Sequence, residues 1–443
     1  MCLSRISERK AKSGIIMQTS RKDFVWNMAG SIVYAFSSML LSFFVMNVLG
    51  AFDGGIFGFG FSTYGQQLFI IAYFGIRPMQ ITDVKGEYTF GDYKRLRMIT
   101  SLFAVLGGFV HLGFLFLNGN YSLNKAAVIW LLAIYKIIDG YADVYESEAQ
   151  RDGRLWVGGR SLMFRTIWAM SGIMLGVLIS GELFTAAMLG VFLQLLYFFI
   201  FEKRDFKNYV IVENDIKVDK AASAERVKNL FNSAFLLFVS VFLDFFVFSA
   251  AKYSIDRIMT DADSGIFNIL FMPTNIIYLV ANFVIKPYMT KLAFAFEKND
   301  LMQFKAVYKK LQYIILGLII AALTAVMLLG RPVLGILEII LGSTYDGMLT
   351  RYKSAFFWII AGGGIYALAN LYYYILVIIR QQRSIFIVYL TAAATAVLSG
   401  GILVKYYGIN GAAYTYLGLM LILFFGFVYI SRKEIKKTFL SKM

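Results

Sequence analysis

The sequence is poor in charged residues, and it contains one cysteine and one histidine. Only 16% of its 443 residues are charged, whereas a soluble protein carries about a quarter. Cys2 has no second cysteine with which to form an intramolecular disulfide. The chain also lacks metal-ligand spacings, a phosphate-binding glycine loop and a nucleophile elbow. We therefore expect neither enzymatic activity nor a cofactor.

The sequence is rich in hydrophobic residues. They make up 59% of the chain, and the mean hydropathy is +0.67. Apolar runs of about 20 residues recur from end to end, long enough to cross a bilayer core of ~30 Å. Because these runs are continuous rather than alternating with period two, they predict helices and not a transmembrane barrel. The expected fold class is an all-α polytopic membrane protein.

The apolar runs predict twelve transmembrane helices. We place them at residues 24–48, 57–77, 96–117, 126–146, 161–180, 183–202, 231–251, 264–286, 312–330, 354–379, 384–404 and 411–431.

The net charge of +16 has two interpretations. In a soluble protein it would indicate a nucleic-acid partner. Here 35 of the 43 Lys and Arg residues fall on the side that both termini share, 7 fall on the other side, and Lys136 lies inside a span. This asymmetry follows the positive-inside rule. We therefore expect both termini in the cytoplasm and no nucleic-acid partner.

The chain divides into two similar halves. The longest polar break, residues 202–229, separates six spans from six. Gly55-Ile56-Phe57 recurs as Gly265-Ile266-Phe267, and Arg77-Pro78 is matched by Lys286-Pro287, at offsets of 210 and 209 residues. Such a duplication predicts an N-lobe (1–202), a cytoplasmic linker (203–229) and a C-lobe (230–443). We expect the lobes to be related by a parallel pseudo-two-fold repeat, as in secondary transporters.

Two predicted helices carry polar stripes. In the first span the stripe consists of Asn27, Ser31, Tyr34, Ser38 and Ser42, and it is either a cavity wall or a helix–helix contact. In the fourth span it consists of Lys136, Asp139, Asp143, Glu146 and Gln150, spaced 3, 4, 3 and 4 residues apart. This spacing places them on one helix face, which we expect to line the space between the lobes, with Lys136 and Asp139 paired. The alternative is a structural ion pair with Glu146 and Gln150 beyond the membrane.

Other polar residues inside the spans have alternative interpretations. Asp244 is either an ion- or proton-coupling site or a structural partner for a cation. Lys252 is expected to pair with Asp256. Arg165 is expected to extend towards the membrane surface, and the alternative is that it faces the cavity. Arg77-Pro78 and Lys286-Pro287 are typical of helix ends. The amides Gln66, Gln67, Asn275 and Asn282 suit either sugar hydroxyls or contacts between helices.

Three stretches of sequence resemble a known family. The run KYSID (252–256) with the following SGIFNILFMPTNIIYLVANFVIKPYMTKLA, the segment DGYADVYESEAQRDGRLWVGGRSLMFR (139–165) and YGINGAA (407–413) are similar to bacterial polysaccharide flippases of the Wzx type. These belong to the multidrug/oligosaccharidyl-lipid/polysaccharide (MOP) exporter superfamily. The resemblance covers essentially the whole chain, and it implies two six-helix bundles around a central cationic cavity.

The resemblance implies that the chain moves an undecaprenyl-diphosphate-linked oligosaccharide across the bacterial cytoplasmic membrane. The expected partners are this lipid-linked substrate, membrane lipids, a polysaccharide polymerase and glycosyltransferases. The candidate substrate-binding residues are Lys136, Arg165, Lys252, Lys286, Arg77, Asn27, Tyr34, Gln66 and Asn275. The candidates for ion or proton coupling are Asp139, Asp143 and Asp244.

Two other functions are compatible with the sequence. A cation-coupled drug exporter of the same superfamily would usually carry an acidic residue inside the first span, where this chain has Asn27. A membrane polymerase or ligase acting on lipid-linked glycans would be expected to have a large external loop, and the predicted loops are short. Both comparisons favour polysaccharide transport.

Overall fold

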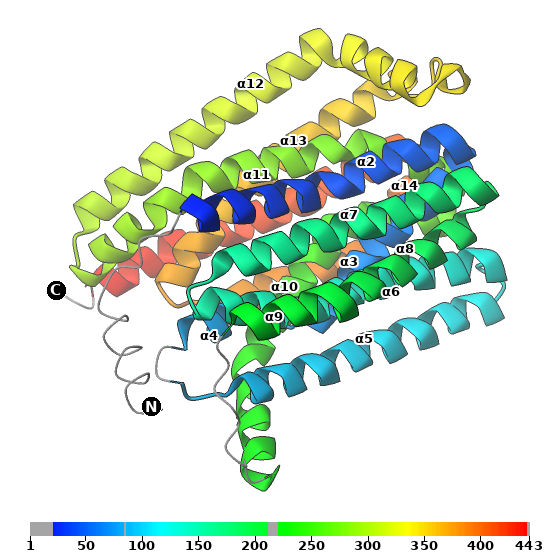
Figure 1. The fold of residues 1–443 in the computed structure, drawn as a ribbon. Helices are drawn as coiled ribbons and strands as arrows, with labels where there is room; N and C mark the ends of the chain where they lie inside the picture. The colour runs from blue at the N-terminus through cyan, green and yellow to red at the C-terminus, as the bar shows by residue number, and fades with distance from the viewer. Residues whose placement is uncertain (1–20, 84–85, 211–219, 441–443) are drawn as a thin grey trace. The chain divides into compact units, whose positions relative to one another are not determined.

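The computed structural model describes residues 21–83, 86–210 and 220–440 (Figure 1). Every regular element among these residues is helical, which confirms the all-α fold class. The elements are α2 (Arg21–Phe59), η1 (Gly60–Tyr64), α3 (Gly65–Tyr73), α4 (Arg77–Thr82), α5 (Phe90–Leu117), α6 (Leu123–Arg151), α7 (Leu155–Ser180), α8 (Leu183–Tyr197), η2 (Phe198–Glu202), α9 (Lys203–Tyr209), α10 (Lys220–Ile258), α11 (Asp261–Glu297), α12 (Leu301–Leu341), η3 (Ser343–Tyr345), η4 (Thr350–Tyr352), α13 (Lys353–Ile378) and α14 (Gln382–Leu440).

The helices have the length and polarity of membrane spans. Nine helical stretches among the described residues are long and apolar enough to cross a bilayer. The helix α6 is not one of them, because its polar stripe lowers its hydropathy. The helices α2 and α14 each contain a non-helical glycine, Gly50 (φ 90°) and Gly408 (φ 56°), at which two helices join. With α6 included and these two bends separated, the arrangement is consistent with twelve spans in a multi-pass membrane protein.

The described residues group into two compact units. The N-terminal unit comprises those up to Leu41 and from Gly60 to Phe238, and the C-terminal unit comprises Ser42–Phe59 and those from Val239 onward. In the N-terminal unit, α6 contacts α3, α4, α5, α7 and α8. In the C-terminal unit, α13 contacts α11, α12 and α14. Each unit is therefore built around one central helix.

The boundaries between the two compact units do not coincide with the polar break at residues 202–229. Tyr345 donates a hydrogen bond to the Met46 carbonyl oxygen (2.7 Å), which ties the second half of α2 to the C-terminal unit. The expected linker, 203–229, begins in α9 and ends in α10. Its residues 211–219 lie outside the described residues. The division into lobes 1–202 and 230–443 stays a prediction.

The repeated Gly-Ile-Phe sequences meet inside the C-terminal unit. A Cβ atom on Gly55 of α2 would lie 1.7 Å from the carbonyl oxygen of Asp261, and one on Gly265 of α11 would lie 2.8 Å from the carbonyl oxygen of Ala51. The two backbones therefore approach more closely than any side chain permits. Small residues at such crossings are typical of membrane helix packing.

Replacing Gly55 with alanine is expected to lower the stability of the protein by about 1–3 kcal/mol, because the added methyl group must push the helices apart. The matched control is Gly107→Ala in α5, where a Cβ atom meets nothing within 4 Å and alanine is the better helix former. Thermal unfolding in detergent measures both variants. Equal midpoints for Gly55→Ala and the parent would contradict this close packing.

Candidate functional site

The polar stripe of α6 is buried inside the N-terminal unit. Ser122 caps the helix by accepting a hydrogen bond from the backbone N–H of Lys125, and α6 then runs without a break through all five stripe positions. The exposed fractions of Lys136, Asp139, Asp143 and Glu146 are 4%, 3%, 6% and 6%. Buried charges require partners, and most of these partners are arginines from neighbouring helices.

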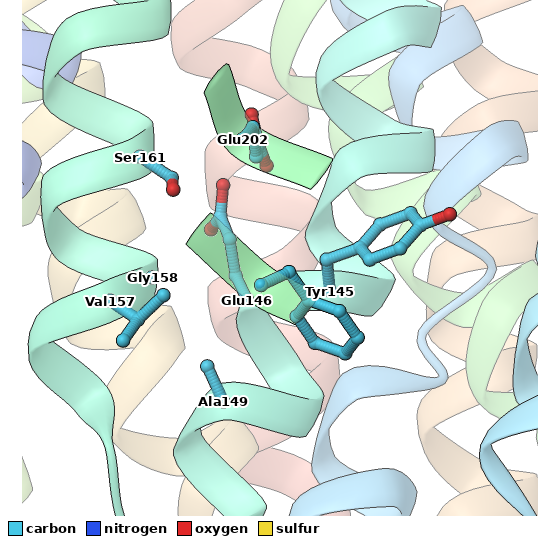
Figure 2. Close-up of a pocket in the computed structure, with 8 residues that line it drawn as sticks. Tyr145, Glu146, Ala149, Val157, Gly158, Ser161 and Glu202 are labelled. Carbon is cyan, nitrogen blue, oxygen red and sulfur yellow. The ribbon is translucent and has the colours of Figure 1, made fainter. Parts of the chain in front are cut away.

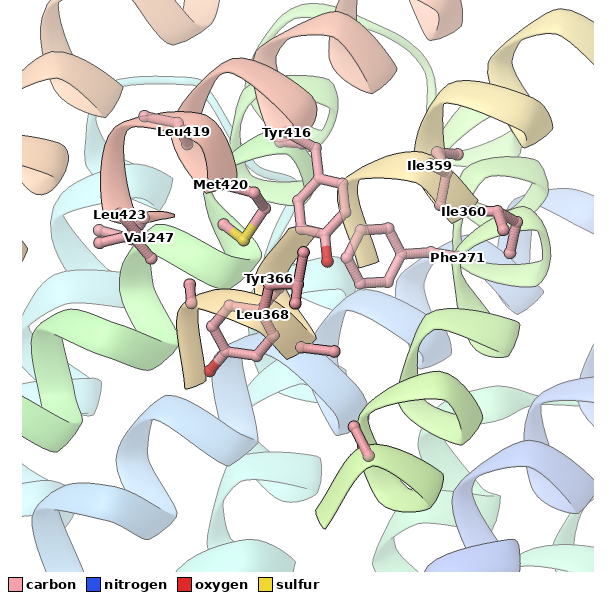
Figure 3. Packing of buried hydrophobic residues seen from close by; sticks show 14 of the residues in the cluster. Val247, Phe271, Ile359, Ile360, Tyr366, Leu368, Tyr416, Leu419, Met420 and Leu423 are labelled. Carbon is pink, nitrogen blue, oxygen red and sulfur yellow. The ribbon is translucent and has the colours of Figure 1, made fainter. Parts of the chain in front are cut away.

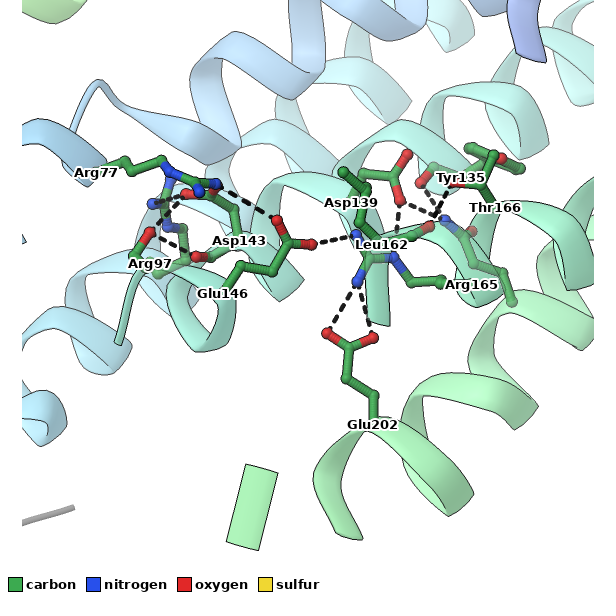
Figure 4. Close-up of polar contacts among 12 residues, drawn as sticks. Arg77, Arg97, Tyr135, Asp139, Asp143, Glu146, Leu162, Arg165, Thr166 and Glu202 are labelled. Atoms are coloured by element: carbon green, nitrogen blue, oxygen red, sulfur yellow. Dashed lines mark hydrogen bonds and ion pairs between the residues drawn. The ribbon is translucent and has the colours of Figure 1, made fainter. Parts of the chain in front are cut away.

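Arg165 of α7 binds three carboxylates at once (Figure 4). Its Nε lies 3.0 Å from Asp139 Oδ1, its Nη2 lies 2.8 Å from Glu146 Oε1, and its Nη1 lies 2.9 and 2.8 Å from the two oxygens of Glu202. The residue is 1% exposed. The guanidinium fork suits several carboxylates in fixed directions, so Arg165 joins α6, α7 and η2.

Two further arginines bind Asp143 (Figure 4). Arg97 of α5 lies 2.8 Å from Asp143 Oδ2, and Arg77 of α4 pairs with Oδ1 and with Glu146. Arg77 is positioned by a helix break after Tyr73, where Phe74 and Gly75 adopt positive φ. Arg97 also donates to the Tyr73 carbonyl oxygen, satisfying one of the carbonyls that the break leaves without a helical partner.

These ion pairs correct several expectations. Asp139 and Asp143 do not lie on an open wall, because each is buried and paired with an arginine of its own unit. The expected pair of Lys136 with Asp139 does not form, because Arg165 and Gln194 bind Asp139 Oδ1. Arg165 does not extend to the membrane surface, because three carboxylates hold it in the interior. Ion pairing compensates the burial of these charges.

Lys136 is the exception in the stripe. Among the described residues it forms no ion pair, and aromatic rings surround its ammonium group. The Nζ atom lies 3.9 Å from the centre of the Phe61 ring, 5.0 Å from that of Tyr34 and 5.6 Å from that of Tyr135. Cation–π contacts stabilise a desolvated ammonium group by about 2 kcal/mol. They do not neutralise its charge.

Local backbone geometry makes room for Lys136. The segment η1 is a π-helix of five residues, an irregularity that is frequent at functional sites. It is followed by Gly65, where a Cβ atom would lie 3.0 Å from Lys136 Cγ and 3.2 Å from the Leu132 carbonyl oxygen. Only a glycine therefore allows the lysine stem to pass this close to the start of α3.

Several polar atoms near Lys136 lack hydrogen bonds. Within the part of the chain that the structure describes, Tyr34 Oη, Tyr135 Oη and Asp139 Oδ2 are buried without a hydrogen-bond partner. Tyr34 and Tyr135 are the phenols whose rings flank the ammonium group. Buried polar atoms are normally hydrogen-bonded. The surroundings of Lys136 thus combine one cation with two free phenols and one carboxylate oxygen.

A small cavity opens beside the ion pairs (Figure 2). Its volume is about 10 Å³, next to Glu146 and Glu202, and the Ser161 side chain points into it. Ligand sites for drug-sized molecules have about 300–1,000 Å³. This cavity is therefore too small for a lipid-linked glycan.

The remaining candidates are dispersed. Lys252 is buried with its Nζ 4.6 Å from the centre of the Phe271 ring, and the described residues form no ion pair with it, so the expected pair with Asp256 is absent. Asn27 and Gln66 are half-buried in the N-terminal unit, and Asn275 is exposed in the C-terminal unit. The side chain of Lys286 lies outside the described residues.

Sequence reasoning missed three residues of the network: Arg97, Gln194 and Glu202. Arg97 lies at the start of a predicted span, close to the basic residues that precede it. Glu202 stands at the predicted boundary between a span and the polar break. The three stripe carboxylates and Glu202 provided the available signal, because so many acids near membrane depth require buried cations.

Sequence comparisons identify no relative. No family model matches the chain, and no curated protein matches it. Structural comparison does find similar proteins. One is described as the inward-facing conformation of a multidrug resistance MATE family transporter of the MOP superfamily. It has a TM-score of 0.71 and 12% identity over 91% of this chain and 95% of that chain.

Two further structures agree with this match. A MATE protein in the bent conformation has a TM-score of 0.53 and 15% identity, covering 95% of this chain and 99% of that one. A eukaryotic MATE transporter has a TM-score of 0.51 and 14% identity, covering 100% and 99%. Identities this low show the fold alone. The chain therefore has the all-helical fold of the MATE transporters of the MOP superfamily.

Proposed function

We propose that the chain is a flippase that moves an undecaprenyl-diphosphate-linked oligosaccharide from the cytoplasmic to the outer leaflet of the bacterial membrane. It would work by alternating access and supply cell-surface polysaccharide synthesis. The fold supports a transporter, and the resemblance of residues 139–165 and 252–293 to Wzx-type flippases supports this substrate class. Both termini would lie in the cytoplasm.

The observation that carries the proposal is the environment of Lys136. A phosphate group accepts charge-assisted hydrogen bonds from ammonium groups and hydrogen bonds from phenols. Lys136 has no carboxylate partner among the described residues, and the rings beside it, Tyr34 and Tyr135, carry hydroxyl groups without a hydrogen-bond partner. Arg165 offsets the charge of the neighbouring Asp139. A diphosphate would therefore find one uncompensated cation and two donors there.

Drug export is the second candidate function. It is favoured by the multidrug resistance transporter among the similar structures and by Asp244, which forms no ion pair with any described cation. An organic cation would complement such a carboxylate. In this function Asp139 or Asp244 would couple transport to an ion or a proton. The third candidate, Asp143, does not suit that role, because arginines bind both of its oxygens.

Reconstituted vesicles distinguish the two functions. The parent protein is expected to move lipid-linked oligosaccharide extracted from the producing cells across the bilayer, measured by glycan accessibility to a membrane-impermeant enzyme. It is expected not to concentrate ethidium under an ion gradient. Ethidium transport without any glycan-lipid transport would overturn the flippase proposal in favour of drug export.

A further inference from the structure

A second polar cluster lies in the C-terminal unit, away from the α6 stripe. It combines one carboxylate, two amides and four phenols from α10, α11, α13 and α14, and we call it the Asp244 cluster. Its members are Asp244, Tyr278, Asn282, Tyr366, Asn370, Tyr374 and Tyr389. Sequence reasoning separated these residues, because nothing in the spacing along the chain shows that the four helices meet.

Phenols hold the carboxylate in this cluster. The Tyr366 hydroxyl lies 3.0 and 2.9 Å from the two oxygens of Asp244. Figure 3 shows the Tyr366 hydroxyl directed away from Phe271 and the apolar cluster behind it. No described lysine or arginine pairs with Asp244. Hydrogen bonds therefore stabilise the Asp244 carboxylate, but no described cation compensates its charge.

The amides extend the site along α11 and α13. Asn282 Oδ1 accepts hydrogen bonds from Asn370 Nδ2 (3.2 Å) and from the Tyr374 hydroxyl (3.1 Å). The Tyr278 ring stacks on that of Tyr366, with centroids 5.3 Å apart and planes 26° apart. Asn370 and Tyr374 follow Tyr366 by one and two helical turns, so all three share one face of α13.

The members of the cluster differ in burial. Tyr366, Asn282 and Asn370 are buried, whereas Asp244 and Tyr278 are only half-buried. Tyr374 is also half-buried. The buried members fix the geometry, and a ligand would reach the cluster through the half-buried ones, a carboxylate and two tyrosines. Rigid aromatic surfaces with a few fixed polar groups are typical of small-molecule sites.

We propose that the Asp244 cluster binds a sugar ring of the transported glycan. Sugar rings have apolar C–H faces that pack on aromatic rings, and hydroxyl groups that donate to carboxylates and exchange hydrogen bonds with amides and phenols. A phosphate is disfavoured, because Asp244 repels it and the cluster offers no cation. This assignment rests on the proposed flippase function and adds a glycan subsite separate from Lys136.

The subsite is tested by comparing two lipids. One is lipid-linked oligosaccharide extracted from the producing cells, and the other is undecaprenyl diphosphate without sugar. Binding of each to the purified full chain in nanodiscs is measured for the parent, for Asp244→Asn and for Tyr278→Ala. Both variants are expected to bind the glycan lipid at least about tenfold more weakly and the bare lipid within about twofold of the parent.

The matched control is Tyr372→Phe, in the same tyrosine run of α13. Tyr372 is buried and packs against Phe424 instead of joining the cluster, so binding of both lipids is expected to stay at the parent level. Equal weakening for both lipids in the Asp244 and Tyr278 variants would overturn the inference, as would unchanged binding of the glycan lipid.

The proposed function can fail separately. If the parent binds neither lipid but binds ethidium, and Asp244→Asn abolishes that binding, the cluster is a cation site and the flippase proposal fails with the sugar subsite. If the parent binds both lipids equally well, the flippase proposal stands and the sugar subsite fails. If Lys136→Gln weakens both lipids while Asp244→Asn weakens only the glycan lipid, the separation of the two sites is supported.

Discussion

Replacement of Arg165 with glutamine is expected to destabilise the protein by about 3–5 kcal/mol. Arg165 is 1% exposed and is the shared partner of Asp139, Glu146 and Glu202. A neutral amide in its place leaves two buried carboxylates, Asp139 and Glu202, without a cation. Only Glu146 retains a second contact, to Arg77 at 3.4 Å. Chemical denaturation of purified protein in detergent measures the loss.

The controls separate this effect from a general loss of surface charge. Arg160→Gln removes a pair between Arg160 and Asp205, whose side chains are 25% and 17% exposed, and is expected to cost less than about 1 kcal/mol. Adding Glu202→Gln to Arg165→Gln removes one of the two uncompensated charges, and is expected to recover part of the loss. If Arg165→Gln unfolds at the same denaturant concentration as Arg160→Gln, the central role of Arg165 is wrong.

The helices were predictable because their signal is local. Most predicted spans match continuous helical segments of the structure, since hydrophobic runs and helix-compatible spacing need no knowledge of neighbours. The exception is the span 57–77, which crosses the helix break after Tyr73. The bend at Gly50 falls close to the break predicted between the first two spans, and the bend at Gly408 lies between the last two. A glycine there adopts a positive φ that other residues disfavour.

The pairing of the stripe could not be predicted in the same way. The 3-4 spacing of Asp139, Asp143 and Glu146 correctly placed them on one face of α6. Their partners come from other helices, including Arg97, which is 46 residues from Asp143 along the chain. A sequence shows which face is polar, but the neighbours of that face are set by tertiary packing. The prediction that this face lines an open space was therefore wrong, because arginines of neighbouring helices pack against it.

The same reasoning explains why Lys136 differs from its neighbours. The sequence predicted a partner one turn away, at Asp139, but Arg165 makes three kinds of contact in a fixed fork and binds that carboxylate instead. Lys136 is left among Phe61, Tyr34 and Tyr135. The competition between two cations for one carboxylate thus produces the free charge on which the proposed function depends.

Lys136→Gln is expected to reduce transport of the lipid-linked oligosaccharide about ten- to a hundredfold. A hydrogen bond to a charged group contributes about 1.5–3 kcal/mol, and each 1.4 kcal/mol corresponds to about a tenfold change. Glutamine retains most of the side-chain length and a donor but removes the charge. Because no described carboxylate pairs with Lys136, the substitution leaves no buried anion uncompensated, and the folded protein is expected to remain as stable as the parent. Vesicle flipping and thermal unfolding measure the two effects on the same preparations.

Lys125→Gln is the matched control, because Lys125 lies on the same helix with its Nζ 4.2 Å from the centre of the Tyr121 ring. It is three turns from Lys136 and outside the proposed phosphate site, so it is expected to transport at the parent rate. Tyr34→Phe removes one of the free phenols and is expected to give an intermediate loss, since the cation remains. Parent-level flipping by Lys136→Gln would show that the aromatic surroundings hold a structural lysine. An equal loss in Lys125→Gln would instead indicate that the transport rate follows the total charge of α6, and the phosphate site at Lys136 would be rejected.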